Sequence, residues 1–121
     1  RAIDWIQSVF DFKANPTFSQ EELEALLEYF EITHDELDKN ISDLSGGERQ
    51  RLAIIVSVLL KREVFLFDEI TSALDAHLKQ KTADYFLRKN EWTVIVSSHD
   101  PVWLNRPQVN VFDLKEQKWK R

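Results

Sequence analysis

The eight residues LSGGERQR at positions 44–51 contain both glycines of this 121-residue chain, adjacent at Gly46 and Gly47. Ser45 with Glu48 three residues later is the S-x-x-E pattern that caps a helix start. The first amides of a helix lack partners within it, and the helix dipole adds partial positive charge there. Without side chains at the glycines, an anion such as phosphate can approach these donors. A well-capped helix alone would show the same pattern, so both interpretations stay open.

An acidic pair, Asp68 and Glu69, directly follows the apolar run VFLF at 64–67. A carboxylate at a strand end can hold the water shell of Mg²⁺, which takes few protein ligands. The adjacent carboxylate can accept a proton from an attacking water and so act as a general base. Taken alone, such a pair is more typical of a solvated strand end.

Two further motifs hold groups capable of chemistry, SSHD at 97–100 and TSALD at 71–75. His99 follows a second apolar run and can donate a hydrogen bond to a phosphate, although a single histidine there is more often structural. Asp75 lies where a helix is expected to begin, and without further context it is a helix cap.

The elements that position these groups can be predicted from the apolar pattern. The continuous apolar runs at 64–67 and 93–96 predict strands covered on both faces, as in a parallel sheet. A helix over about 75–89 connects them, so the unit is βαβ and its strands should be parallel. The acidic pair and His99 are then expected at the carboxyl edge of one sheet, where open α/β sheets bind ligands.

The residues before these strands predict helices, and those after them predict further strands. Helices are expected at 1–12, from Ser19 with its capping partner Glu22, briefly at 33–37, and from Ser45 to about Lys61. The last of these is apolar on nearly every face and should be buried on more than one side. A third strand is expected at 108–114 and a short hairpin at 115–119.

Composition excludes several classes of protein. A net charge of −5 argues against a broad electrostatic grip on nucleic acid. The absence of cysteine excludes disulfides and thiolate metal sites. The longest apolar run, 52–60, is well short of the roughly 20 residues that a membrane helix needs. The chain has no methionine, which suggests a segment of a longer protein.

In this order and spacing, LSGGERQR, VFLFDEITSALD and VSSHD resemble the ATP-binding-cassette (ABC) ATPases over residues 1–114. In that resemblance they are the signature motif, the Walker B strand with the D-loop, and the switch-histidine motif. The fold implied is α/β, a partial P-loop NTPase core with parallel strands and an N-terminal helical subdomain. Residues 1–61 would form the helical subdomain with the signature, and 62–121 the C-terminal part of the core.

The resemblance also implies roles for individual residues, with ATP and Mg²⁺ as cofactors. Asp68 would serve Mg²⁺, Glu69 would be the catalytic base and His99 would contact the γ-phosphate. The remaining nucleotide-binding candidates are in the signature and the D-loop: Ser45, Gly46, Gly47, Glu48 and Asp75. The signature residues would cap the γ-phosphate of ATP held by a partner subunit.

The function implied is that of an ATP-binding and ATP-hydrolysing subunit that couples nucleotide-driven dimer closure to transport. The expected partners are a second ATPase subunit across the signature and membrane-spanning permease subunits, with no nucleic acid. The expected location is cytoplasmic, peripheral on the cytoplasmic face of the cell membrane. Ile70 stands where most members of the family have proline. With this isoleucine, the motif DEITSALD resembles a branch of the family linked to metal or iron export. No residue selects a transported substrate or its direction.

One family motif is absent from these residues. A phosphate-cradling loop needs G-x-x-x-x-G-K-S/T, which two adjacent glycines cannot supply. The chain therefore resembles about half of a nucleotide-binding domain. It is expected to bind ATP poorly and hydrolyse none alone, and to associate through exposed strand faces or edges.

Two other functions compete with a transporter subunit. A DNA-maintenance ATPase of the SMC/Rad50 type shares LSGGE and the acidic pair. The tight spacing from Ser45 to Asp68, the lack of sustained heptads and the acidic charge weigh against it. The second is a non-catalytic interaction module without a P-loop, in which Glu69 and His99 would have no purpose.

Overall fold

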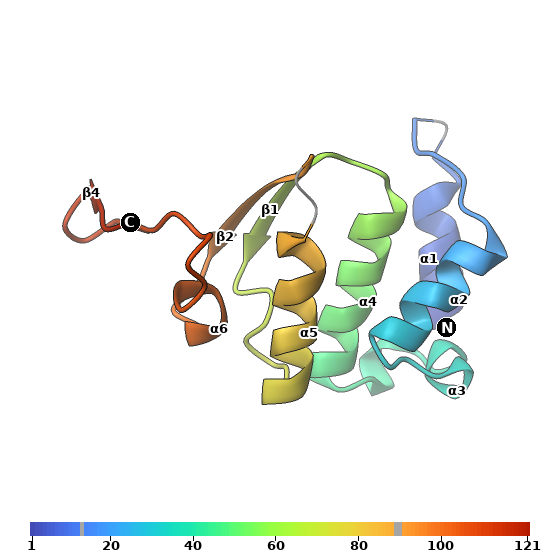
Figure 1. The fold of residues 1–121 in the computed structure, drawn as a ribbon. Helices are drawn as coiled ribbons and strands as arrows, with labels where there is room; N and C mark the ends of the chain where they lie inside the picture. The colour runs from blue at the N-terminus through green and yellow to red at the C-terminus, as the bar shows by residue number, and fades with distance from the viewer. Residues whose placement is uncertain (13, 89–90) are drawn as a thin grey trace.

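The computed structural model describes residues 1–12, 14–88 and 91–121 (Figure 1). Its elements in chain order are helices α1 (Ala2–Phe10), α2 (Gln20–Tyr29) and α3 (His34–Leu37), a 3-10 turn (Ile41–Asp43), α4 (Gly46–Leu59), β1 (Val64–Asp68), α5 (Ala76–Leu87), β2 (Thr93–Ser97), α6 (Pro101–Leu104), β3 (Phe112–Asp113) and β4 (Lys118–Trp119). Figure 1 shows α4 and α5 between the β1–β2 pair on one side and α1 and α2 on the other. The expected combination of an α/β part and an N-terminal helical part is confirmed.

The predicted caps begin the predicted helices. The Ser19 side chain accepts a hydrogen bond from the Glu22 amide at the start of α2. Ser45 forms the expected capping box at the start of α4, and Thr33 forms a second one, which was not predicted, at the start of α3. The expected burial of α4 on more than one side is also confirmed, since five of its side chains are buried: Leu52, Ile54, Ile55, Val56 and Leu59.

Aromatic side chains join α5 to the strands and to α2. The ring centroid of Phe86 lies 5.3 Å from that of Phe65 and 4.9 Å from that of Phe67, both in β1. Tyr85, one residue earlier, lies 5.2 Å from Tyr29 of α2. Offset and edge-on aromatic pairs of this kind add about 0.5–1.5 kcal/mol each beyond their burial. Helix α5 is thus fixed between the strand pair and the helical part.

The two central strands pair in parallel, with Val64 opposite Thr93 and Asp68 opposite Ser97, which confirms the βαβ unit. The expected burial on both faces is wrong. Phe65 and Phe67 are buried beneath the helices, whereas Leu66 is 73% exposed and Ile95 is 58% exposed. The physical reason is that helices cover one face of the pair only (Figure 1). The structure instead fits the separate expectation that this chain exposes apolar strand faces, since Val64, Leu66 and Ile95 are exposed.

The expected third strand at 108–114 is wrong in extent and in pairing. Only Phe112–Asp113 is a strand, and it pairs antiparallel with Lys118–Trp119 rather than with the parallel sheet. A tight local turn explains this, because the Asp113 side chain accepts the Lys115 and Glu116 amides and Gln117 adopts a φ of 53°. A terminal hairpin is present, but it begins at Phe112 rather than at Lys115. The predicted end of the α5 helix at Lys89 lies outside the described residues.

Candidate functional site

The signature residues form the first turn of α4. The Ser45 hydroxyl accepts the Glu48 amide at 3.1 Å, and the Glu48 carboxylate accepts the Ser45 amide at 2.8 Å. A hydrogen bond with Glu36 and a second with the Ser45 amide lower the pKa of Glu48 to about 2. Burial and the hydrogen bond with Glu48 raise the pKa of Glu36. Glu48 is therefore ionised at neutral pH and holds the cap closed.

Gly47 is required by a close approach within the chain itself. A Cβ atom added to Gly47 would lie 2.8 Å from the carbonyl oxygen of Ala73, in the loop between β1 and α5. At Gly46 an added Cβ would lie 3.5 Å from the Ala73 Cβ, which is an ordinary contact. The sequence indicated an approach to this glycine pair, but not that the chain's own loop makes one.

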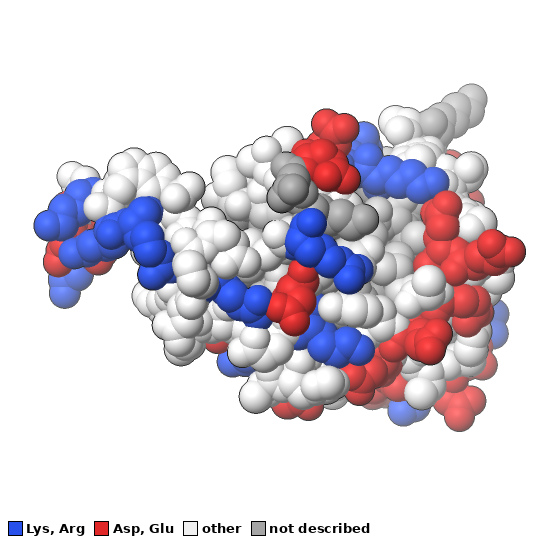
Figure 2. Space-filling view, viewed as in Figure 1, with Lys and Arg blue, Asp and Glu red and all other residues white. Residues whose placement is uncertain are grey.

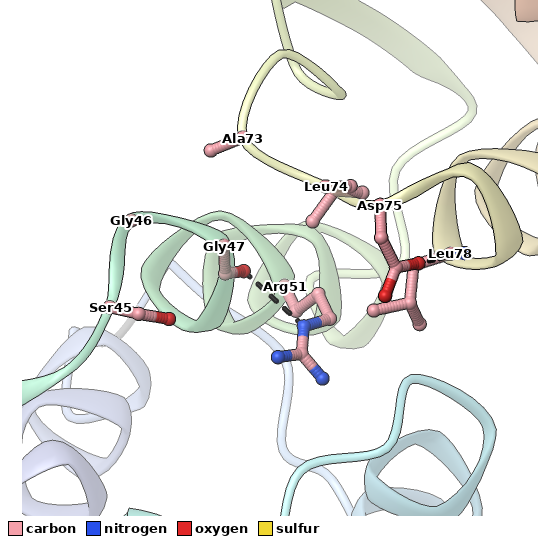
Figure 3. Close-up of a pocket in the computed structure, with 8 residues that line it drawn as sticks. All are labelled: Ser45, Gly46, Gly47, Arg51, Ala73, Leu74, Asp75 and Leu78. Carbon is pink, nitrogen blue, oxygen red and sulfur yellow. Dashed lines mark hydrogen bonds between the residues drawn. The ribbon is translucent and has the colours of Figure 1, made fainter.

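A shallow cleft of about 370 Å³ opens between the start of α4 and this loop (Figure 3). Its lining residues are Ser45, Gly46, Gly47, Arg51, Ala73, Leu74, Asp75 and Leu78. The structure thus brings four predicted nucleotide-binding residues to one cleft. Glu48 is not among the lining residues.

Two side chains hold the walls of the cleft. Arg51 donates to the carbonyls of Gly47, Phe30 and Glu31, at 3.3, 2.9 and 2.8 Å. Asp75 accepts the Leu78 amide at 2.9 Å and is the N-cap of α5, as its interpretation as a helix cap predicts. Arg51 therefore ties the start of α4 to the end of α2, and Asp75 fixes the start of α5.

The acidic pair lies where β1 ends. Asp68 is the last strand residue and is exposed, and Glu69 follows with a φ of 51°. The Glu69 amide donates to the Ser97 carbonyl at 2.8 Å, across the end of the parallel pair. The left-handed conformation turns the chain sharply away from the sheet. A residue other than glycine adopts this conformation at a cost in conformational energy.

His99 lies at the same edge of the sheet, two residues beyond the end of β2, and is exposed. The expected arrangement of the acidic pair and His99 at one edge is therefore present. The ranges 1–12, 14–88 and 91–121 hold no group of three or more His, Asp or Glu residues placed to bind a metal ion. A single exposed carboxylate such as Asp68 fits Mg²⁺, which keeps most of its waters.

A buried polar network next to His99 gave no signal in the sequence. Thr71 donates to Asp100 Oδ2 at 3.0 Å, and Lys79 Nζ lies 3.0 Å from the same oxygen. The Trp103 indole donates to Thr71 Oγ1 at 3.3 Å. Burial acts to raise the pKa of Asp100, but hydrogen bonds from the Val102 amide, Lys79 and Thr71 outweigh it and lower that pKa. The network joins the loop after β1 to the residue that follows His99.

Gln50 is a second residue that sequence reasoning missed. Its side-chain amide donates to the Glu69 carbonyl at 3.2 Å and to Ser72 Oγ at 3.0 Å, and its oxygen accepts the Ala73 amide at 3.0 Å. These contacts cross 19 to 23 positions of sequence, so no local pattern could have predicted them.

Charge is unevenly distributed on the face shown in Figure 2. Acidic side chains gather over the side that carries α2, and basic side chains lie over α5 and the terminal hairpin. Within the described part of the chain, no helix combines the length and apolar character needed to cross a membrane.

The comparisons with known proteins identify the class. The sequence model described as ABC transporter matches residues 5–72, more than half of the chain, and the chain belongs to this family. The structure resembles the dimeric structure of a bacterial ABC transporter cassette, with a TM-score of 0.67 and 25% sequence identity. That match covers 82% of this chain and 46% of the cassette. The fold is therefore that of part of an ABC cassette.

Two relatives are similar over about two thirds of the chain. A Helicobacter pylori protein named probable iron chelatin transport ATP-binding protein is 38% identical over 84 residues, 67% of this chain and 33% of that protein. The Escherichia coli protein named probable iron export ATP-binding protein FetA is 38% identical over 82 residues, 65% of this chain and 36% of FetA. The chain spans about a third of the length of these relatives.

Proposed function

We propose that the chain contributes the signature, Walker B, D-loop and switch-histidine elements to an ATP-hydrolysing subunit of an ABC transporter. One observation carries this proposal. The parallel β1–β2 pair places Asp68, Glu69 and His99 at one edge, and the first turn of α4 packs against the loop that follows. Within the subunit, residues 1–61 form the helical subdomain and 62–121 the C-terminal part of the ATPase core.

At the sheet edge, each residue has a role that its chemistry suits. Glu69 accepts a proton from the attacking water, and His99 donates a hydrogen bond to the γ-phosphate of ATP. Asp68 is the residue that would hold Mg²⁺, which neutralises charge on the phosphates when bound. The exposure of Asp68 and His99 leaves both side chains accessible to a ligand.

At the cleft, the first turn of α4 binds ATP that a second ATPase subunit holds on its P-loop. The residues concerned are Ser45, Gly46, Gly47 and Asp75, which line the cleft, and Glu48, which caps the turn. Free amides at a helix start and the helix dipole favour a phosphate. The dimeric cassette that the fold resembles supports a subunit pair of this kind.

In the complete transporter the subunit acts with membrane-spanning permease subunits, on the cytoplasmic face of the cell membrane. The printed names of the H. pylori and E. coli relatives favour transport related to iron. A direct check is iron content in cells that lack the gene, with and without a plasmid-borne copy. Unchanged iron content in the deletion strain would contradict this part of the proposal.

The activity is tested in the complete gene product that contains these 121 residues, purified and assayed for phosphate release with ATP and Mg²⁺. We expect turnover, its loss in Glu69→Gln, and retained ATP binding and ATP-dependent dimerisation in that variant. Glu63→Gln removes a carboxylate from an exposed position just before β1 and serves as the matched control. Turnover that survives in Glu69→Gln would contradict the role of Glu69. A wild-type protein without turnover would favour a non-catalytic module, and salt-sensitive DNA binding would favour the DNA-maintenance class.

A further inference from the structure

The Gln50 side chain contacts the loop between β1 and α5 near its start and beyond its middle. Its nitrogen donates to the carbonyl of Glu69, where the loop begins, and its oxygen accepts the amide of Ala73, four residues later. The nitrogen also donates to Ser72 Oγ. The side-chain amide of this one residue of α4 therefore makes three hydrogen bonds to the loop.

Hydrogen bonds hold the backbone of Glu69 from opposite sides. Its amide donates to the carbonyl of Ser97 in β2 at 2.8 Å, and its carbonyl accepts the Gln50 side chain of α4 and the Ser72 amide, each at 3.2 Å. The residue is held with a φ of 51°, a conformation that non-glycine residues keep only when their surroundings impose it. Gln50 is the side chain that restrains the carbonyl side of this residue, and so helps to orient the carboxylate.

The same helix carries the two glycines of the signature about one turn earlier. Gly47 precedes Gln50 by three positions, about 4.5 Å along a helix, and its Cα approaches the Ala73 carbonyl closely enough to exclude a side chain. The loop thus contacts α4 at two successive turns. Because a hydrogen-bonded helix moves as a unit, a shift of its first turn also shifts the group that holds Glu69.

We propose that Gln50 is a positioning residue that couples the signature turn of α4 to the orientation of the Glu69 carboxylate. The inference rests on the proposed ATPase function, in which Glu69 is the general base. Gln50 itself touches neither water nor nucleotide in this role. It acts through the peptide group of Glu69, so its removal should slow the chemical step more than it weakens ATP binding.

The kinetic test uses the complete gene product and three variants. Gln50→Ala removes all three hydrogen bonds and should lower kcat by about ten-fold or more, with KM for ATP within about two-fold of wild type. Gln50→Glu can still accept the Ala73 amide but cannot donate to the Glu69 carbonyl, so its kcat should fall similarly while Tm falls less. Gln80→Ala removes an exposed glutamine of α5 that accepts a hydrogen bond from Arg106. It is the control for the loss of a glutamine contact outside this loop, and its kcat should match wild type.

A double-mutant comparison separates positioning from a structural role. In the Glu69→Gln background, Gln50→Ala should cause little further loss of residual turnover, because the group it positions is already absent. Hydrogen exchange should be faster at the Ser72 and Ala73 amides of Gln50→Ala, while exchange in α5 is unchanged. Equal losses in both backgrounds, or a kcat like that of Gln80→Ala, would overturn the inference while leaving the ATPase function intact. If wild type showed no turnover, or turned over no faster than Glu69→Gln, the proposed function would be overturned and the inference with it.

Discussion

Thr71 donates a hydrogen bond of 3.0 Å to the carboxylate of Asp100, although 29 positions separate them in the sequence. The bond ties the loop that follows Glu69 to the residue that follows His99. Both residues are shielded, since Thr71 is fully buried and the side chain of Asp100 is only 9% exposed. The two halves of the sheet edge are therefore held in fixed relation by a polar contact, in addition to the pairing of β1 with β2.

Thr71→Val should destabilise the protein by about 1–3 kcal/mol, because it leaves the Trp103 indole without its acceptor and takes one donor from Asp100. Urea unfolding measures the change. Thr82→Val is the matched control, since Thr82 is also fully buried but donates only to the Leu78 carbonyl of its own helix. If the two variants lost equal stability, the network around Asp100 would contribute nothing of its own.

Glu36→Gln should stabilise the protein near pH 7 and change nothing near pH 4. Burial and the hydrogen bond with Glu48 raise the pKa of Glu36 above 4.5, so the stability that its protonated form contributes is present below pH 4.5. That stability is lost as the pH rises through the raised pKa. The amide of glutamine can donate to Glu48 at every pH, as the protonated acid does. It also keeps the oxygen that accepts the Thr33 amide at 3.2 Å.

The measurement is Tm as a function of pH from 4 to 8, with Asp35→Asn, an exposed neighbour, as control. Below pH 4.5 the stability also falls in wild type and variant alike. The pKa of Glu48 is lowered to about 2, so the stability that its ionised form contributes is lost between pH 4.5 and about 2. A Tm difference between Glu36→Gln and wild type that stays constant across pH 4 to 8 would contradict the assignment.

Gly47→Ala and Gly46→Ala should have opposite effects on stability. The new Cβ at position 47 would lie 2.8 Å from a backbone oxygen, so the loop must move, at a cost of about 1–3 kcal/mol. At position 46 the new Cβ makes an ordinary contact at 3.5 Å, and alanine in a helix gains up to about 1 kcal/mol over glycine. Thermal unfolding compares the two variants directly. A loss at position 46 as large as that at position 47 would rule out the contact with Ala73 as the cause.

Leu66→Lys should reduce self-association of the 121-residue chain. Leu66, Val64 and Ile95 form an exposed apolar face on the parallel pair, and such faces promote association. Sedimentation at several protein concentrations gives the measurement. Leu114→Lys, at a site 80% exposed in the terminal hairpin, is the control for the added charge. If the control variant lost association to the same degree, the strand face would not be the contact.

The predictable parts of this fold are those with local rules. The caps at Ser19 and Ser45 follow from the four-residue pattern S-x-x-E, and the parallel pairing follows from two apolar runs joined by a helix. Which face of a strand is covered depends on the number of layers around it, so Leu66 was expected to be buried and is exposed. The prediction of a strand at 108–114 was wrong for a related reason, because a strand needs a neighbouring strand. The local turn at Asp113 pairs Phe112–Asp113 with Lys118–Trp119 instead of with the parallel sheet.

The site divides in the same way. The motifs predicted that Asp68, Glu69 and His99 lie at one sheet edge and that Ser45 begins a helix. The chemical roles of these residues stay predictions for the experiments above. Gln50 and Asp100 lie within motifs, but their contacts could not be predicted, since each acts on residues about 20 to 30 positions away. The close approach to Gly47 lies between these cases. A glycine pair indicates that another group approaches the backbone closely. Only the structure identifies that group as the Ala73 carbonyl.

The left-handed backbone at Glu69 has a consequence for how this position tolerates change. A residue with a Cβ atom in that conformation costs roughly 1–2 kcal/mol, and glycine or asparagine adopts it more readily. A library of variants selected only for resistance to heat should therefore enrich glycine and asparagine at position 69. A parallel library selected for ATP turnover should retain glutamate there, so the difference between the two selections would separate the demands of folding from those of chemistry.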